Sequence, residues 1–399
     1  MAMKQTQTKL FDFSDAGLDF CAGSKNLFPD RFKKMLALGY NEQTVSSVVV
    51  AGNQVTLTYG VSHGYVADRV LKVNAPELLT INGGEFVIDS VTANTVTMTI
   101  DSAPNSIAGN FTSKVASLGW SLEYENANIH VYKFKYLDNT DRYLRLCFQD
   151  NSAHRNRVAV CLGKTYDSVT GFIADPNSLA ETRDILTPNI YCWEFTQAAN
   201  STYNNYTYSQ GLSAFGLGVV VGSIYHMFSL HNTNSNNTTC HTMGVFPVIS
   251  LFAELNNHAL ICEYYTAGNV AANARQIEAG RIFINQVSLG LTKDSTSLAN
   301  PAGDGFNASY YSSQVQNFNI TSAFPLALYE RSTGQIVGYA KGVFRVSYVH
   351  SSPPISTTVA NLPRQTKDID LENHFFVHGI SNSSGHFYAL GFAIEGING

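Results

Sequence analysis

Short runs in which apolar and polar residues alternate follow one another along most of this chain, and no other feature limits its fold as strongly. Residues 54–59 (QVTLTY), 95–100 (TVTMTI) and 130–136 (HVYKFKY) have the period of two at which successive side chains point to opposite faces of a strand. Glycine and asparagine separate several runs, as at 51–53 and 81–84, which is typical of hairpin turns. No repeat of fixed length is present, so a propeller or solenoid is not favoured. The chain is predicted to be mainly β, with few short helices.

The predicted strands lie close together early in the chain and farther apart beyond residue 118. Short antiparallel strands separated by turn residues are typical of barrels and sandwiches. We expect a small N-terminal β barrel or sandwich module followed by a larger antiparallel β-sandwich region. Further strands are predicted at 48–50, 70–73, 85–91, 142–148, 157–162, 223–229, 245–252, 259–265, 281–289, 323–329, 342–349 and 386–393.

Three regions follow from this spacing. We expect an N-terminal arm with a short helix at 1–44, the small β module at 45–117 and the larger β-sandwich region at 118–399. A module of roughly 70 residues has a limited core and is expected to lean on the larger region. Residues 197–210 are mostly Asn, Ser, Thr and Tyr, which is typical of an exposed loop. A further division of the larger region near this loop stays open.

One helix signal stands out in the first region. Residues 31–38 carry apolar side chains at helical spacing, and Gly39 follows them as a stop. Asp30 precedes them as a cap, and Pro29 favours an extended approach of the chain. A helix over 31–38 is therefore predicted.

The composition excludes several classes of partner. Charged residues form only 14% of the 399 residues and the formal net charge is −5, so no general attraction to nucleic acid is expected. No apolar run of about 18 residues is present, which excludes insertion in a membrane by a helix. The polar start lacks the apolar stretch of a secretory signal, so export by that route is not expected. The six cysteines form no Cys-x-x-Cys pair and are expected to be small buried hydrophobes.

The densest group of metal-type ligands is His226, His231, Cys240 and His241. Structural zinc needs four such groups in a tetrahedron. Cys240 and His241 are adjacent, so on a strand their side chains point to opposite faces. The step of five between the two histidines fits no common ligand spacing. A polar loop, with Cys240 buried at the start of a strand, is the favoured interpretation.

His374 and His378 form a second pair, and on a helix their spacing of four suits one metal ion. The flanking Phe376 and Val377 favour a strand instead, on which the two imidazoles share a face but lie too far apart for one ion. A ligand pair at a subunit interface stays open, but no metal site is predicted.

Four acidic residues are candidates for a glycosidase pair: Glu123, Asp138, Asp141 and Asp150. Such a site needs two carboxyl groups about 5 to 9 Å apart, which a sequence does not show. In a chain with so few charges, turn and strand-edge roles are the stronger explanation.

Residues 216–222 (GLGVVVG) superficially match a dinucleotide-binding loop. The third glycine falls one residue late, and β-branched residues follow instead of a helix, so a buried strand is favoured. No Gly-x-Ser-x-Gly elbow, P-loop or His-Glu-x-x-His motif is present. The chain is therefore predicted to be no enzyme, with no catalytic residue and no cofactor.

Several short motifs follow one another in an order that is known from one family. They are Ser62-His63-Gly64-Tyr65-Val66, residues 81–87 (INGGEFV), residues 91–97 (VTANTVT), Leu118-Gly119-Trp120 and residues 143–146 (YLRL), after the helix and Leu38-Gly39-Tyr40. This layout resembles structural proteins of tailed-bacteriophage virions, usually of the tail or baseplate, and the small β unit resembles their Ig- or SH3-like modules. The similarity extends to 325–329, 334–338 and 342–344. Departures between 142 and 157 and at 197–210 leave the position within the virion open.

The resemblance implies a noncatalytic structural subunit of the phage virion that is assembled in the host cytoplasm. Its partners would be copies of itself and other virion proteins, joined by repeated interfaces. Within the N-terminal arm, Phe11, Phe13, Phe20 and Leu27 are candidate anchors on a neighbouring subunit.

Two alternatives stay open. One is a receptor-binding or glycan-binding tail fibre or spike, in which Tyr203, Tyr206 and Tyr208 would stack on the sugars of a host-surface glycan. The other is a capsid decoration protein, which would differ from a tail subunit only in location.

Overall fold

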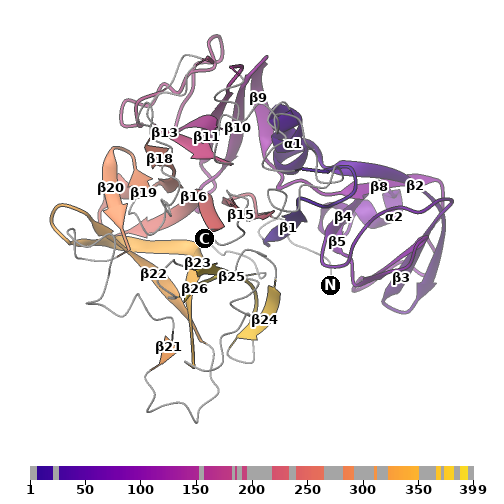
Figure 1. Cartoon of the computed structure of the whole chain (residues 1–399). Coiled ribbons are helices and arrows are strands. Elements are labelled where there is room, and N and C mark those ends of the chain that lie inside the picture. Colours follow the sequence, from indigo (N-terminus) through magenta and orange to yellow (C-terminus); the bar gives the residue numbers. More distant parts are fainter. Residues whose placement is uncertain are drawn as a thin grey trace.

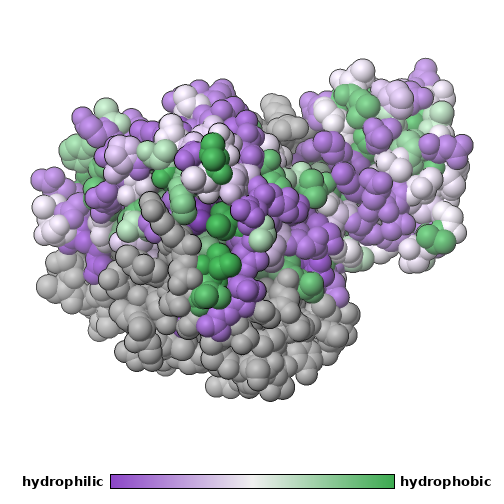
Figure 2. Space-filling model, turned by 90° about the horizontal axis from the view of Figure 1, so that it is seen from above, coloured by the Kyte–Doolittle hydropathy of each residue, from purple (hydrophilic) through white to green (hydrophobic). Residues whose placement is uncertain are grey.

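The computed structural model describes a mainly β chain, as the sequence predicts. Its strands form three sheets, and a small barrel projects as a lobe from a larger body (Figures 1 and 2). In the described part of the chain, no helix is long and apolar enough to cross a bilayer. The described residues are 7–20, 27–151, 157–181, 185–186, 191–195, 218–232, 240–264, 282–291, 310–311, 322–349, 365–369, 373–381 and 387–393.

The small lobe is an antiparallel sheet that closes on itself. Its strand order is β5-β4-β8-β2-β3-β7-β6, and only Ile88 and Asp89 separate β5 from β6, so the chain links the two ends of the sheet. Backbone hydrogen bonds from Ile88 to Arg69 and from Asp89 to Thr97 continue the closure. The strands are β2 (Tyr40–Ala51), β3 (Gln54–Tyr59), β4 (Val70–Val73), β5 (Glu85–Val87), β6 (Ser90–Val91), β7 (Thr95–Thr99) and β8 (Phe111–Val115), with α2 (Pro76–Leu79) and the 3₁₀ turn η3 (Asn82–Gly84) between β4 and β5.

The second sheet has six strands in the order β18-β13-β12-β11-β10-β9. The predicted hairpin is present, with Lys133 opposite Tyr143 and Asn139 at positive φ in the turn. The indole of Trp193 donates to the carbonyl of Ile261 in the third sheet, which ties the two sheets together. The strands are β9 (Ser121–Asn126), β10 (Ile129–Lys135), β11 (Asp141–Phe148), β12 (Arg157–Gly163), β13 (Tyr191–Glu194) and β18 (Glu263–Tyr264).

The third sheet has thirteen strands in the part of the chain that the structure describes. On β14, Val220 faces one hydrophobic core while Val219 and Val221 face a second, so this strand is covered on both sides. Over residues 218–222 this arrangement matches the buried strand that the sequence predicts there, while 216 and 217 lie outside the described residues. The strands are β1 (Lys9–Asp12), β14 (Gly218–Gly222), β15 (Met227–Asn232), β16 (Cys240–Ser250), β17 (His258–Ile261), β19 (Ile282–Ile284), β20 (Val287–Gly290), β21 (Tyr310–Tyr311), β22 (Ser322–Glu330), β23 (Ile336–Val349), β24 (Gln365–Ile369), β25 (Asn373–Ser381) and β26 (Phe387–Ala393), with the 3₁₀ turn η6 (Ala253–Leu255) after β16.

The predicted helix is present but begins earlier than expected. Helix α1 (Phe28–Lys33) runs into the π-turn η2 (Lys34–Leu38), and Leu27, not Asp30, occupies the N-cap position. Pro29 lies in the first turn, where its missing N–H costs no hydrogen bond. Asp30 lies inside the helix and pairs with Lys34 at 3.0 Å. The prediction of Asp30 as the cap is therefore wrong, whereas Gly39 ends the helix as expected.

Gly39 provides a test of how the helix joins the barrel. Its φ of +75° and ψ of 178° lie in a region that only glycine occupies readily, and an added Cβ would lie 2.3 Å from the carbonyl oxygen of Val115. We expect Gly39→Ala to lower the free energy of unfolding by about 3 kcal/mol, measured by urea denaturation. The matched control is Gly52→Ala, because Gly52 also has positive φ but an added Cβ there meets nothing within 4 Å. This control is expected to cost about 1 kcal/mol, and equal losses in the two variants would contradict the prediction.

Candidate functional site

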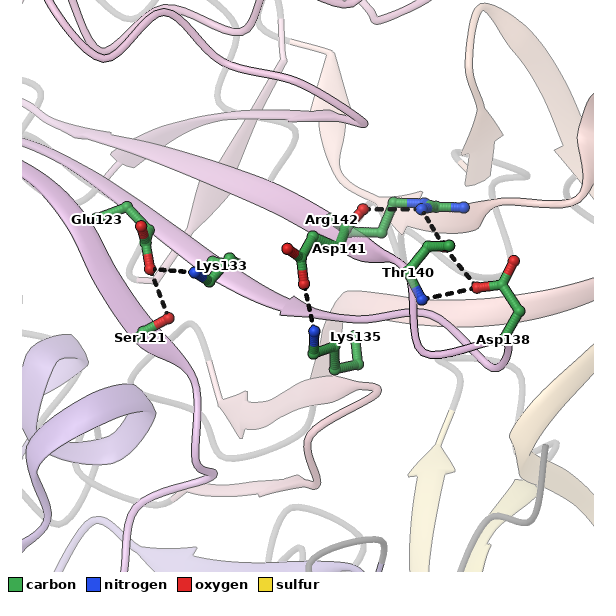
Figure 3. Close-up of polar contacts among 8 residues, drawn as sticks. All are labelled: Ser121, Glu123, Lys133, Lys135, Asp138, Thr140, Asp141 and Arg142. Carbon is green, nitrogen blue, oxygen red and sulfur yellow. Dashed lines mark hydrogen bonds and ion pairs between the residues drawn. The ribbon is translucent and has the colours of Figure 1, made fainter.

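Three of the carboxylates proposed as glycosidase candidates, Glu123, Asp138 and Asp141, lie on the strands β9 to β11 of the six-stranded sheet and the turn between β10 and β11 (Figure 3). Glu123 on β9 accepts hydrogen bonds from Lys133 Nζ at 2.8 Å and from Ser121 Oγ at 2.7 Å. Asp141 pairs with Lys135 at 2.5 Å. Each of the two carboxylates therefore has its own cation on the neighbouring strand β10.

Asp138 lies in the turn between β10 and β11 and accepts hydrogen bonds from the backbone N–H and the hydroxyl of Thr140. Arg142 donates to the Thr140 hydroxyl at 2.8 Å and to Asn257 at 2.7 Å. The bonds from Thr140 lower the pKa of Asp138, and the bond from Lys133 lowers that of Glu123. A general acid needs a raised pKa, so these surroundings favour turn and cross-strand roles for both groups.

Two members of the predicted histidine and cysteine group have described side chains, and both lie in the core and not in a polar loop. His226 and His231 are fully buried, with Nδ1 of each within hydrogen-bond distance of a serine hydroxyl, Ser223 and Ser229 respectively. The His231 ring also stacks on Phe195, with ring centroids 4.7 Å apart. In the described residues, no three His, Cys, Asp or Glu side chains gather as metal ligands do.

Two further predictions concern strands whose side chains are not described. Cys240 and His241 begin β16, where the backbone of His241 lies opposite that of His231. His374 and His378 lie on β25, which is a strand as predicted. The aromatic candidates Tyr203, Tyr206 and Tyr208 lie outside the described residues.

The side chains of four of the six cysteines are described, and all four are buried thiols that form no disulfide: Cys147, Cys161, Cys192 and Cys262. This agrees with the prediction of small buried hydrophobes. Burial raises the pKa of the Cys161 thiol to about 12, so this thiol stays protonated at neutral pH.

The N-terminal segment packs within its own chain, so the prediction of an arm on a neighbouring subunit is wrong for the described residues. Phe11, Phe13 and Phe20 are buried in the chain's own core, and only Leu27 is half-buried. Phe13 and Phe20 pack edge to face with their centroids 4.4 Å apart. The three phenylalanines are therefore not exposed anchors, because the apolar surface that they offer is already covered within the same chain.

Residues 7–20, which we call the N-terminal clasp, instead join the barrel to the large sheet. Strand β1 pairs antiparallel with β14 at the edge of that sheet, between the barrel and the body (Figure 1). Lys9 reaches from β1 to the barrel, where its Nζ lies 2.6 Å from Glu85 Oε2 and 2.6 Å from the carbonyl oxygen of Ser117. The side chains of Lys9 and Glu85 are both buried, so the ion pair is shielded from water.

A second buried ion pair lies at the other end of the clasp. The Asp15 carboxylate accepts two hydrogen bonds from Arg69, at 2.8 and 3.0 Å, and one from the Tyr40 hydroxyl at 2.7 Å. Burial opposes the charge on Arg69, but the Asp15 carboxylate prevails and raises the pKa of the guanidinium. Burial, reinforced by Asp15, raises the pKa of Tyr40 well above its usual value, so Tyr40 stays a hydrogen-bond donor.

Sequence reasoning missed this arrangement. Its one available signal was the presence of charged residues beside short apolar runs, as in Lys9-Leu10-Phe11 and Arg69-Val70-Leu71. A charge next to a strand core is buried only where it finds a partner. The sequence does not show which distant residue supplies that partner.

Comparisons with known proteins assign no family to the chain. No family model matches it. No curated protein matches it either. Among solved structures, a phage phi92 endosialidase aligns with 89% of this chain and 52% of its own length, at 9% identity and a TM-score of 0.16. The chain thus spans about half the length of that protein, and a similarity this low carries no argument about fold or activity.

The clasp predicts a large loss of stability when one charge is removed. Asp15→Asn leaves Arg69 buried without its counter-charge, and breaking a buried ion pair in this way costs about 3–5 kcal/mol. We expect a loss of that size in the free energy of unfolding, measured by urea denaturation. Glu123→Gln, at the more exposed pair with Lys133, serves as the control and is expected to cost less than about 1 kcal/mol. Similar losses for the two variants would show that the clasp does not hold the fold.

Buried histidines predict a loss of stability in acid. Burial lowers the pKa of His226 and His258 to about 3 and that of His130 to about 4. As the pH falls below about 6.5, these histidines bind protons in the unfolded chain but stay neutral in the folded chain. The free energy of unfolding should therefore fall by about 1.4 kcal/mol per pH unit for each of the three, until the pH nears the folded pKa.

His258→Gln isolates one of these contributions, because an amide can replace the hydrogen bond to the carbonyl of Tyr225. In urea denaturation between about pH 6 and 4.5, the slope of stability against pH should fall by about 1.4 kcal/mol per unit in this variant. An unchanged slope would mean that His258 is charged in the folded chain.

Proposed function

We propose that this chain is a noncatalytic structural subunit of a bacteriophage virion, of the tail or baseplate. Its partners are copies of itself and other virion proteins, and it works by forming the same contacts many times. The family resemblance of the sequence motifs supplies the virion assignment.

The observation that supports a structural role is that charged side chains pair with one another within the molecule. Inside the molecule, Lys9–Glu85 and Asp15–Arg69 fix the barrel on the body. On the six-stranded sheet, Glu123 and Asp141 pair with lysines of the adjacent strand. These charges stabilise the arrangement of strands, which supports a chain whose work is to keep a shape and present surfaces.

The described surface also suits protein contacts. Large apolar side chains are exposed on strands of the large sheet, including Ile249, Phe324 and Tyr339. Charged residues are depleted, and aromatic residues enriched, at the centres of protein–protein interfaces. The low charge of the whole chain is consistent with extensive contacts of this kind.

Immunogold electron microscopy of virus particles from the same source tests this function. Antibodies raised against the purified chain should label one defined location, and quantitative mass spectrometry of the particles should find several copies of the chain in each. Labelling at the tail or baseplate is the expected result, because repeated interfaces require many copies at one location.

Two outcomes would contradict the proposal. One is the absence of the chain from purified particles. The other is turnover of a glycan by the purified chain that is lost in Glu123→Gln or in Asp138→Asn, because that result would assign these carboxylates to catalysis.

A further inference from the structure

An exposed apolar surface lies where β16 and β23 pair in the large sheet. Ile249 and Tyr339 are directly opposite each other on the two strands and are 48% and 43% exposed. The chain continues from β16 into Leu251 and Phe252, which are also exposed, and a backbone hydrogen bond from Leu251 to Val337 holds this extension on β23. We call these four side chains the β16–β23 surface. Contiguous exposed apolar side chains rimmed by charges mark interaction sites.

One charged residue lies at each end of this surface. Lys341 follows Ala340, the partner of Val248, on β23 and is partly exposed, so it lies at the end of the surface away from Leu251 and Phe252. Glu254 follows Phe252 by two residues, in the exposed turn η6 at the opposite end. Among the described residues neither charge has an ion-pair partner. The surface is therefore positive at one end, apolar in the middle and negative at the other end.

Two other charges near the negative end do not change this pattern. Glu330 accepts hydrogen bonds from Ser332 and Thr333 in the hairpin between β22 and β23. Arg331 is its neighbour in the sequence and has the opposite charge. The two charges offset each other, which leaves Glu254 as the uncompensated charge at this end.

We infer that the β16–β23 surface binds the same surface of a second copy of this chain across a two-fold axis. A two-fold axis through the apolar middle reverses the direction of one copy. Lys341 of each copy then meets Glu254 of the other, and the four apolar side chains of each copy are buried against those of its partner. A contact of this kind is self-complementary, since one surface supplies both the positive and the negative end.

This inference names one contact of the assembly and rests on the proposed function for its role in a virion. The geometry itself requires only two copies of the chain. Failure of the contact and failure of the proposed function are therefore observed separately. A chain found in particles whose self-association ignores this surface overturns the inference alone, and a dimer of a chain absent from particles overturns the function alone.

Sedimentation velocity of the full chain over a range of concentrations tests the contact. The unmodified chain should form a dimer, and Ile249→Asp should raise its dissociation constant about tenfold or more, because a carboxylate would be buried in the apolar middle. Val49→Asp is the matched control, since Val49 on β2 of the barrel is 61% exposed and lies in a different sheet from β16. This control should leave the dimer unchanged. Circular dichroism establishes that each variant is folded.

Charge reversal tests the two-fold arrangement. Lys341→Glu and Glu254→Lys should each weaken the dimer, because each places like charges together at both ends of the contact. The double variant restores opposite charges at both ends, so it should bind as tightly as the unmodified chain. Rescue by the double variant is a result that a merely destabilised fold does not give.

Three results would overturn the inference: a chain that stays monomeric at roughly 100 µM, a dimer that Ile249→Asp leaves intact, and single charge reversals that the double variant does not rescue.

Discussion

The arrangement of the barrel on the body depends on the buried ion pair between Asp15 and Arg69. With Lys9 six residues earlier, Asp15 gives the N-terminal clasp two charged attachment points on the barrel, Arg69 and Glu85. Apolar residues alone would let β1 slide along β14 by two residues and still bury the same face. The charges remove that freedom, because a shifted strand would leave both ion pairs broken inside the protein.

Because the chain has few charged residues, each of them has a larger effect on folding and on surface contacts. A chain with only 14% charged residues has few means of opposing unwanted contacts on its surface. In the described residues, charges hold the clasp, pair β9 with β10, and flank the exposed strands β16 and β23. Lys341 and Glu254 take part in none of these contacts within the described chain, and our inference assigns them to the contact between two copies.

Local pattern was enough to predict many of the strands. Residues 70–73 and the hairpin around Asn139 are present as expected, because alternation and turn residues act over a few positions. Strand β1 was missed because its four residues include two charges and its partner β14 lies about 200 residues away in the sequence. The cap at Asp30 was misplaced because Pro29 also fits inside a first turn.

The sites were harder to predict than the strands, because the residues that form them also lie far apart in the sequence. Whether Ile249 is buried or exposed is decided by its pairing with Tyr339, ninety residues later, and by the breaks in register between β22 and β23. A break in register moves side chains from one face of a sheet to the other, so alternation within a strand no longer tells which face meets water. Glu123 and Asp138 show the converse case. Turn and strand-edge roles were favoured for both residues, and neighbours within twenty residues, Lys133 and Thr140, supply the partners for such roles.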